Sequence, residues 1–251
     1  MVRVQIMSDL HIEYKNDEVP DIEDYIIPNA DVLILAGDIG SLYKYDQLKS
    51  FIELLCDKFK IVLYTPGNHE FYMQENYTPK SMSVLVEKLN RLEDNIENLH
   101  ILNGKSVVIE DVCIAGCTLW TNPQCTIPKF LSRIYNINTH KYKKMHEVDL
   151  DYVNRIIEYC EGKDYRLTLI THHPPCFKTL EGSRKRKKYE SLYATDLEYL
   201  LDKNLVKNWI CGHTHANFDF IANNGTRIIG NQKGKPRDKI KTFSKSFVVE
   251  I

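Results

Sequence analysis

Apolar residues follow two repeating patterns along this chain, one typical of strands and one typical of helices. Short apolar runs rich in β-branched residues recur throughout the chain and predict strands. These runs cover residues 2–7, 31–36, 60–64, 106–109, 112–115, 166–171, 207–211, 226–229 and 245–251. Three longer stretches place their apolar residues on one face of a helix. They cover residues 48–59, 82–96 and 150–160.

The order of these elements predicts an α/β fold. Strands and helices alternate in the first part of the chain, which is typical of parallel βαβ units, and the closely spaced later strands predict a second, mixed sheet. No linker rich in Gly, Ser or Pro divides the chain, so we expect a single domain over residues 1–251. Two segments fit neither pattern. Residues 121–145 are expected to form an irregular excursion that is a candidate lid, and residues 177–193 a mobile basic loop.

The composition is that of an ordinary globular protein. Hydrophobic residues make up 43% and charged residues 27% of 251 residues, enough to bury a sizeable core. The formal net charge of −1 gives no overall attraction to nucleic acid or to an anionic membrane. The sequence shows no signal-peptide pattern and no membrane span, and its seven scattered cysteines predict reduced thiols. We therefore expect a cytoplasmic protein without a membrane partner.

Side chains that can bind metal ions follow five of the predicted strands. In chain order they are Asp9 and His11, Asp38, Asn68 and His69, His172 and His173, and His213 and His215. Ligands of open α/β sheets bind beyond the carboxyl ends of the strands, so these groups are expected to converge. Each motif alone is more often a turn or a hydrogen-bonded strand end. Five such motifs arising independently in one chain, each as a simple turn, are far less probable than five motifs that share one metal centre.

The residue types indicate which metals such a centre would hold. Carboxylate, amide and imidazole groups without thiolates suit Mn, Fe, Zn or Ni better than copper or an iron–sulfur cluster. There are too many ligands for one structural zinc. Two metal ions about 3.5–4 Å apart would use all of them. Two divalent ions facing Asp9 and Asp38 leave a net charge of about +2, which should attract a phosphate group.

The motifs D-x-H, GD, GNHE, HH and GHTH, in this order over residues 9–215, resemble the calcineurin-like metallophosphoesterase superfamily. The resemblance implies a four-layer α/β sandwich, in which two mixed β-sheets pack face to face and are flanked by helices. It also implies the ligands of one metal ion, namely Asp9, His11, Asp38 and His215. Asp38 would bridge to a second ion, which is held by Asn68, His172 and His213.

The same resemblance implies a reaction. A metal-bridging hydroxide would attack a phosphate ester, with two divalent transition-metal ions (Mn²⁺, Fe²⁺/Fe³⁺, Zn²⁺ or Ni²⁺) as cofactors. His69 would face the leaving group as the catalytic residue, and His173 would bind substrate or support the metal ligands. The expected substrate is a phosphorylated small molecule or a nucleotide.

Departures from the superfamily pattern narrow the substrate. The chain reads GDIGSLY after Ala36 and carries Pro66 and Gly67 directly before Asn68. It therefore lacks, at those positions, two phosphate-binding arginines and the usual carboxylate partner of His69. We expect a phosphodiesterase or a small-molecule phosphatase rather than a phosphoprotein phosphatase. His11, where lariat-debranching members carry Cys, also sets that activity aside.

Two other functions stay open. One is a non-catalytic scaffold for protein–protein contacts, which the complete set of expected metal ligands disfavours. The other is a nuclease, which would rest on the basic residues 185–188 and on aromatic residues such as Trp120, Tyr135 and Tyr142. A nucleic-acid partner has no other support in the sequence.

Overall fold

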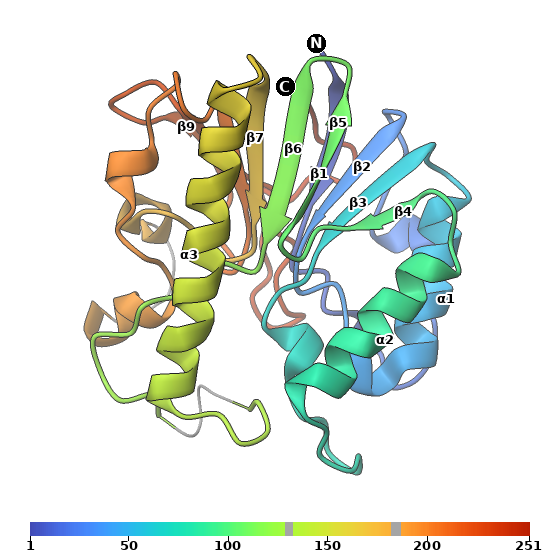
Figure 1. Ribbon diagram of the computed structural model, residues 1–251. Coiled ribbons are helices and arrows are strands. Elements are labelled where there is room, and N and C mark those ends of the chain that lie inside the picture. The colour runs from blue at the N-terminus through green and yellow to red at the C-terminus, as the bar shows by residue number, and fades with distance from the viewer. Residues whose placement is uncertain (129–132, 182–186) are drawn as a thin grey trace.

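Two β-sheets pack face to face at the centre of the molecule (Figure 1). The computed structural model describes residues 1–128, 133–181 and 187–251. Within these ranges the first sheet contains, in spatial order, β11 (Val248–Glu250), β1 (Arg3–Met7), β2 (Val32–Ala36), β3 (Ile61–Thr65) and β4 (Leu99–Ile101). The second contains β5 (Lys105–Ile109), β6 (Val112–Cys117), β7 (Arg166–Thr171), β8 (Asn208–Cys211), β10 (Arg227–Gly230) and β9 (Phe218–Ile221). Both sheets are mixed, because β11, β5 and β9 run antiparallel to their neighbours.

Helices cover the outer face of each sheet (Figure 1). Helices α1 (Tyr45–Cys56) and α2 (Met82–Asp94) lie on the first sheet, and α3 (Thr139–Glu161) lies on the second. Short 3₁₀ helices occupy connections at Ile12–Tyr14, Ile22–Asp24, Leu42–Lys44, His69–Phe71, Phe177–Leu180, Lys187–Leu192 and Glu198–Leu200. The order helices, sheet, sheet, helix confirms the predicted four-layer α/β sandwich. No helix in the described ranges is long and apolar enough to span a membrane.

Alternation of side chains along the strands builds three apolar layers. Ile34 on β2 and Ile210 on β8 point into the layer between the sheets. Their neighbours point outward, so that Leu35 packs in the layer with α1 and α2, and Trp209 in the layer with α3. Complete burial of one such side chain contributes about 1.5–3 kcal/mol. All seven cysteines are free thiols, and all but Cys125 are buried.

The structure differs from the sequence prediction at three elements. The short strands β4 and β9 were not expected, because β4 has three residues and β9 lies at a sheet edge with alternate residues exposed. Helix α3 begins at Thr139 rather than near residue 150, so the last part of the expected excursion is helical. The Asn138 side chain accepts a hydrogen bond from the Lys141 amide and caps this longer helix.

The parallel strands bring the motif-bearing loops to one end of the sandwich. Met7 on β1 pairs with Leu35 on β2, and Leu35 pairs with Tyr64 on β3. In the second sheet Thr171 on β7 pairs with Cys211 on β8. The loops that follow these strands therefore leave the sheets at similar heights, which positions their side chains for contact.

Candidate metal centre

Five of the predicted site residues adopt the left-handed backbone conformation. Their φ angles are +54° at Asp9, +50° at His11, +54° at Asp38, +70° at His213 and +54° at His215. Asp and His tolerate this region better than most residues, yet it still costs on the order of 1–3 kcal/mol. Local strain is thus concentrated where the loops after β1, β2 and β8 meet, which is typical of a functional site.

Glycines in the motifs leave room for these side chains. A Cβ atom on Gly67 would overlap the Asp38 carboxylate and lie 2.8 Å from His172 Nδ1. A Cβ atom on Gly212 would lie 2.6 Å from Asp9 Oδ2. The glycine before Asn68 and the glycine before His213 therefore permit a close approach that no other residue allows.

Asp9, His11, Asp38 and His215 form the first group of convergent side chains. Their donor atoms all lie within 4.8 Å of one another, and all but that of His215 belong to buried residues. The distance from His215 Nε2 to His11 Nε2 is 3.1 Å, and that to Asp9 Oδ1 is 3.2 Å. Asp38 Oδ2 lies 3.8 Å from His11 Nε2.

A second group shares the Asp38 carboxylate. His172 Nε2 lies 3.3 Å from Asp38 Oδ1, 3.1 Å from His213 Nδ1 and 3.0 Å from Asn68 Oδ1. All four residues are buried. The structure thus brings together the seven residues that the sequence singled out as metal ligands, with Asp38 between the two groups.

Each of three imidazole rings is held at its Nδ1 atom by a hydrogen-bond acceptor. His11 Nδ1 lies 3.0 Å from Glu13 Oε1, His172 Nδ1 lies 3.0 Å from the Ala36 carbonyl oxygen, and His215 Nδ1 lies 2.6 Å from Asp238 Oδ2. Donation from each Nδ1–H to its acceptor points the Nε2 atom at the centre of its group. Metal-binding histidines are usually held in this way.

These contacts show that the residues fit divalent metal ions. Two Nε2 lone pairs that face each other across 3.1 Å, at His11 and His215, repel unless a cation lies between them. Carboxylate, amide and imidazole donors without thiolates suit a first-row divalent ion. The chain therefore carries a buried His/Asp cluster that can hold two divalent metal ions.

The electrostatics of the cluster favour positive charge. Burial alone would raise the pKa values of Asp9 and Asp38, but the surrounding imidazoles outweigh it and lower both. Burial acts to lower the pKa of His172, yet the Asp38 carboxylate reverses this and raises it to about 9. The two carboxylates thus stabilise a cation at the point where the groups meet.

Glu13 supplies the carboxylate partner of His69. The carboxylate that usually pairs with this histidine is absent from the GDIGSLY segment, and Glu13 takes its place from another loop. Glu13 Oε1 lies 2.9 Å from His69 Nδ1 and 3.0 Å from His11 Nδ1, with Glu13 buried. Burial opposes the charged form of Glu13, but His11 and His69 outweigh it and lower the pKa to about 2. A single carboxylate therefore joins a candidate metal ligand to the candidate catalytic residue.

His69 itself lies at the wall of the site. Burial lowers its pKa to about 4, against the opposing influence of Asp38 and Glu13. Its ring is neutral at pH 7, donates from Nδ1–H to Glu13, and lines a hollow in front of Asp38 and Asn68.

His173 lies behind the second group rather than in the hollow. It is fully buried, its Nδ1 is 3.1 Å from the Thr118 carbonyl oxygen, and its ring centroid is 4.3 Å from that of His213. Burial and His172 lower its pKa to about 3. This placement favours support of the His213 ring over contact with substrate.

The Glu70 carboxylate ties two of the motif loops together. It accepts hydrogen bonds from the backbone amides of Asp38, Ile39 and Gly67 and from the Tyr64 hydroxyl, at 2.6–3.1 Å. The final residue of the GNHE motif thus fixes the loop after β2 against the loop after β3.

The hollow above the cluster has a volume of about 380 Å³ and is rich in cations and tyrosines. Arg133, Lys235 and Arg237 line it together with Tyr14, Tyr72, Tyr142 and Tyr193. Among the residues that the structure describes, none of the three cations forms an ion pair. Sequence reasoning missed all three, because they lie far from the motifs.

The two segments without a predicted element both reach this hollow. Ile127, Arg133 and Tyr142 belong to the expected excursion over residues 121–145, and Leu192 and Tyr193 belong to the expected loop over residues 177–193. Residues 129–132 of the former, and Lys185 and Arg186 of the latter, lie outside the described residues.

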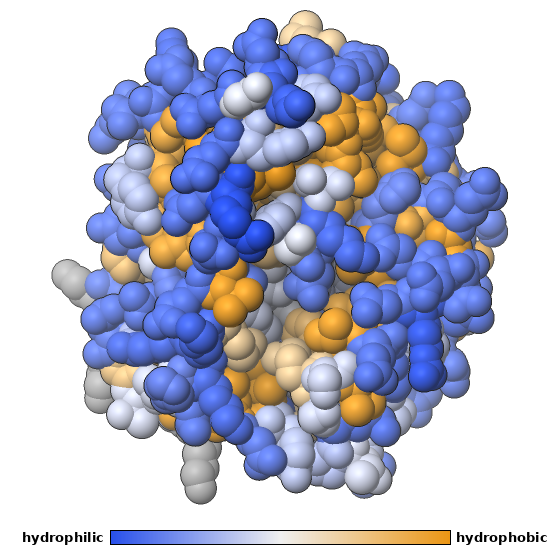
Figure 2. Space-filling view, viewed as in Figure 1, coloured by the Kyte–Doolittle hydropathy of each residue, from blue (hydrophilic) through white to orange (hydrophobic). Residues whose placement is uncertain are grey.

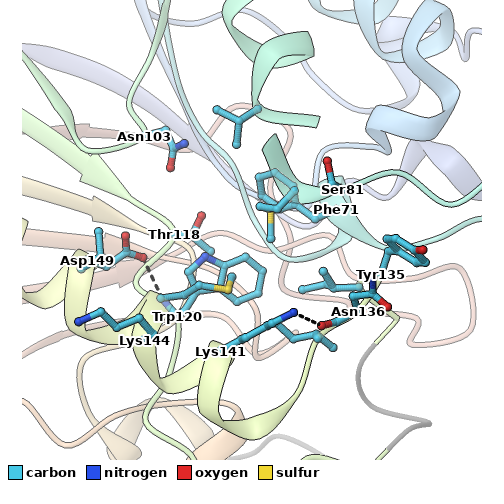
Figure 3. A pocket seen from close by; sticks show the side chains of 16 residues that line it. Phe71, Ser81, Asn103, Thr118, Trp120, Tyr135, Asn136, Lys141, Lys144 and Asp149 are labelled. Atoms are coloured by element: carbon cyan, nitrogen blue, oxygen red, sulfur yellow. Dashed lines mark hydrogen bonds between the residues drawn. The ribbon is translucent and has the colours of Figure 1, made fainter. Parts of the chain in front are cut away.

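A separate, apolar hollow opens between α2 and α3 (Figures 2 and 3). It has a volume of about 560 Å³, and Phe71, Trp120 and Met145 lie in its wall. Its charged side chains are engaged already. Lys141 donates to the Asn136 carbonyl oxygen, and Asp149 accepts from the Trp120 amide. Nothing in this hollow requires a phosphate, so the candidate site is the hollow over the His/Asp cluster.

Comparisons with known proteins identify a matching family model and one curated relative. The family model described as calcineurin-like phosphoesterase matches residues 2–217. An uncharacterised protein of Acanthamoeba polyphaga mimivirus is 24% identical over 262 residues, covering 94% of this chain and 92% of the viral protein.

Two solved structures share the fold at low sequence identity. A phosphopantetheinyl hydrolase from Mycobacterium tuberculosis matches with a TM-score of 0.74 and 15% identity, over 99% of this chain and 95% of that one. A dimetal phosphatase from Danio rerio matches with a TM-score of 0.56 and 12% identity, over 91% and 86%. The chain therefore belongs to the calcineurin-like phosphoesterase family and is a metal-dependent phosphoester hydrolase.

Proposed function

We propose that this chain hydrolyses phosphodiesters of small molecules or nucleotides at the shared His/Asp cluster. The observation that carries the proposal is the orientation of the cluster. Three imidazole Nε2 atoms and two carboxylates converge on it, and each of these imidazoles is held through Nδ1 by a separate acceptor. A scaffold that only binds proteins has no use for so costly an arrangement of buried polar groups.

The ligand roles follow from the two groups of contacts. Asp9, His11, Asp38 and His215 would hold one ion, and Asp38, Asn68, His172 and His213 the other. When bound, two divalent ions lower the pKa of water to about 7 and neutralise charge on a phosphate. We expect Mn²⁺ to support activity, since all the ligands are oxygen or imidazole nitrogen atoms.

The remaining side chains would position the substrate. Arg133 and Lys235 would pair with phosphate oxygens in front of the cluster, which replaces the arginines that the motifs lack. The negative charge of the bound phosphate favours the protonated form of His69. His69, held at Nδ1 by Glu13, would then protonate the leaving oxygen from Nε2, and such acid catalysis is typically worth about 10²–10⁴-fold in rate.

Room on both sides of the cluster favours a diester over a monoester. The hollow in front of His69 and a second hollow beyond His215 share His215, Lys235 and Arg237 in their linings. A phosphate at the cluster could therefore carry one substituent in each hollow. The phosphopantetheinyl hydrolase named above is a precedent for hydrolysis of a phosphopantetheinyl group in this fold.

Chromogenic substrates test this proposal. Protein that has been stripped of metal with a chelator and then supplied with Mn²⁺ should hydrolyse bis-p-nitrophenyl phosphate faster than p-nitrophenyl phosphate. Asp38→Asn should lower turnover by at least about 10³-fold, because it removes the carboxylate that both groups share. Asp94→Asn, an exposed change on α2, should have no effect. Absence of turnover of either substrate with Mn²⁺, Fe²⁺, Zn²⁺ or Ni²⁺ would refute the proposal and favour the scaffold.

A further inference from the structure

A second hollow continues from the metal centre beyond His215. It has a volume of about 800 Å³ and lies between residues 214–217 and the loop over residues 235–242. His215, Lys235 and Arg237 line both hollows, so the second one opens directly beside the candidate catalytic cluster. The proposed function places one substituent of the phosphodiester in this hollow and leaves the chemistry of that substituent open.

The lining of the second hollow is strongly cationic. Lys235, Arg237, Lys239 and Lys241 all come from the one loop. None of these four side chains forms an ion pair with any residue in the described ranges. The opposing charges are Glu181 and Asp238, and Asp238 is engaged with His215 Nδ1 at 2.6 Å. A surplus of unpaired positive charge therefore faces the space.

The loop that carries these cations is anchored, which distinguishes it from a solvated basic tail. The Asp238 carboxylate accepts from the Lys235 amide at 2.9 Å and at the same time holds His215. The Lys233 amide donates to the Ser8 carbonyl oxygen at 3.1 Å, and Asn217 Nδ2 donates to Thr242 Oγ1 at 3.1 Å. The loop is thus tied to the strand end of β1 and to the segment that follows His215.

Lys235 is the clearest sign that an anion belongs here. Its side chain is partly buried between the two hollows, and burial lowers its pKa even though Asp38 and Glu13 favour the charged form. A desolvated ammonium group without a partner is unfavourable unless a ligand supplies the opposite charge. One phosphate at the metal centre could pair with Lys235, but it would leave Lys239 and Lys241 without a partner.

We propose that the hollow beyond His215 binds a second phosphate group of the substrate. The preferred substrates are then small phosphodiesters that carry another phosphate a few bonds away from the ester that is cleaved. Glu181 in the wall, and the chain's net charge of −1, favour such a compact ligand over a long nucleic-acid backbone. This inference rests on the proposed phosphodiesterase function.

Two matched substrates test the inference. They are the p-nitrophenyl ester of thymidine 5′-phosphate and the same compound with an added 3′-phosphate. Both release p-nitrophenol from the same diester, so only the second phosphate differs. In the wild-type protein with Mn²⁺, the 3′-phosphate should raise kcat/KM about tenfold or more at low salt, and 0.5 M salt should remove most of that gain.

Substitutions in the loop over residues 235–242 test whether the gain from the 3′-phosphate arises in this hollow. Lys239→Gln/Lys241→Gln should reduce the advantage of the 3′-phosphate to about threefold or less, because it removes two of the unpaired cations. Lys58→Gln/Lys163→Gln changes the net charge equally at exposed positions outside both hollows and should keep the advantage. Thermal unfolding of each variant checks that the fold is retained.

The outcomes separate this inference from the proposed function. Two results would overturn the second phosphate site and leave the proposed phosphodiesterase function intact. One is an equal kcat/KM for both substrates, and the other is a gain from the 3′-phosphate that persists in Lys239→Gln/Lys241→Gln. If neither substrate is hydrolysed, calorimetric binding of thymidine 3′,5′-bisphosphate to wild-type protein and to the double variant still decides the question. Equal binding by both proteins would overturn the inference. An oligothymidylate that competes far better than the bisphosphate would overturn its restriction to compact ligands.

Discussion

Glu13→Gln is the substitution that most directly tests how Glu13 links the candidate metal ligand His11 to the candidate catalytic residue His69. Glu13 Oε1 accepts from His69 Nδ1 at 2.9 Å and lies 3.0 Å from His11 Nδ1, while Glu13 Oε2 has no partner within the described parts of the chain. Glutamine can keep a carbonyl oxygen at the first position and place its amide nitrogen at the second. The substitution therefore removes charge and keeps the shape.

The size of the effect follows from the change in the hydrogen bonds. A hydrogen bond to a charged group contributes about 1.5–3 kcal/mol, and a neutral one about 0.5–1.5 kcal/mol. The loss at His69 is thus about 1–1.5 kcal/mol, felt when the imidazole is protonated in the transition state. Since about 1.4 kcal/mol is a factor of ten, we expect kcat to fall about tenfold. Glu13→Ala, which removes the acceptor altogether, should lose about 100-fold.

The assay must separate the His69 contact from the His11 contact. Rates are measured for phosphodiesters with a p-nitrophenol and with an alkyl alcohol as leaving group, and the bound metal is determined by elemental analysis. Loss through His69 should be larger for the alkyl ester, which needs a proton, with the metal content unchanged. Glu97→Gln, an exposed change after α2, is the control. Wild-type rates in Glu13→Gln, or equal losses that parallel loss of metal, would refute a role for Glu13 in orienting His69.

Three further results are expected. His69→Ala should retain its metal ions and lose rate most for poor leaving groups; a uniform loss across leaving groups would contradict its role as acid. The pKa of His172 is raised from 6.5 to about 9 in the metal-free fold, so its stabilising contribution is complete below pH 6.5 and is lost as the pH rises through 9. In chemical unfolding of the metal-free protein, the free energy of unfolding should therefore fall between pH 6.5 and pH 9, and with added Mn²⁺ it should not. A free energy of unfolding that stays constant with pH in the metal-free protein would contradict the charge assigned to His172. Gly67→Ala should destabilise the fold by about 1–3 kcal/mol, because its Cβ would overlap Asp38, while Gly162→Ala, with its nearest atom at 3.6 Å, should be close to neutral in the same melts.

The convergence of the candidate metal ligands could be predicted from sequence because these residues follow strands. Each of five ligand candidates comes within three residues of the end of a strand, and parallel strands deliver the following residues to one end of the sheets. These candidates are Asp9, Asp38, Asn68, His172 and His213. Once the strands are recognised, convergence follows from the topology. The left-handed conformations at Asp9, Asp38 and His213 could not be foreseen, since they depend on how the loops pack against each other.

The partners of the ligands could not be predicted. Asp238 reaches His215 only because the loop over residues 235–242 folds back along the sheet end, and no local pattern marks it. Glu13 follows His11 by two residues, and that short spacing was the one available signal. The left-handed turn at His11 is what folds Glu13 back toward His69. Helix α3 was expected to begin too late for a different reason. Its first turns bury Tyr142 and His146, but the lysines at 141, 143 and 144 hide this apolar face in the sequence.

Crystals soaked in Mn²⁺ and measured for anomalous scattering test the central claim most directly. Two peaks are expected about 3.5–4 Å apart, with the Asp38 carboxylate in contact with both. One peak should lie among Asp9, His11 and His215, and the other among Asn68, His172 and His213. A single peak, or two peaks that do not share Asp38, would contradict a two-metal phosphoesterase centre in this chain.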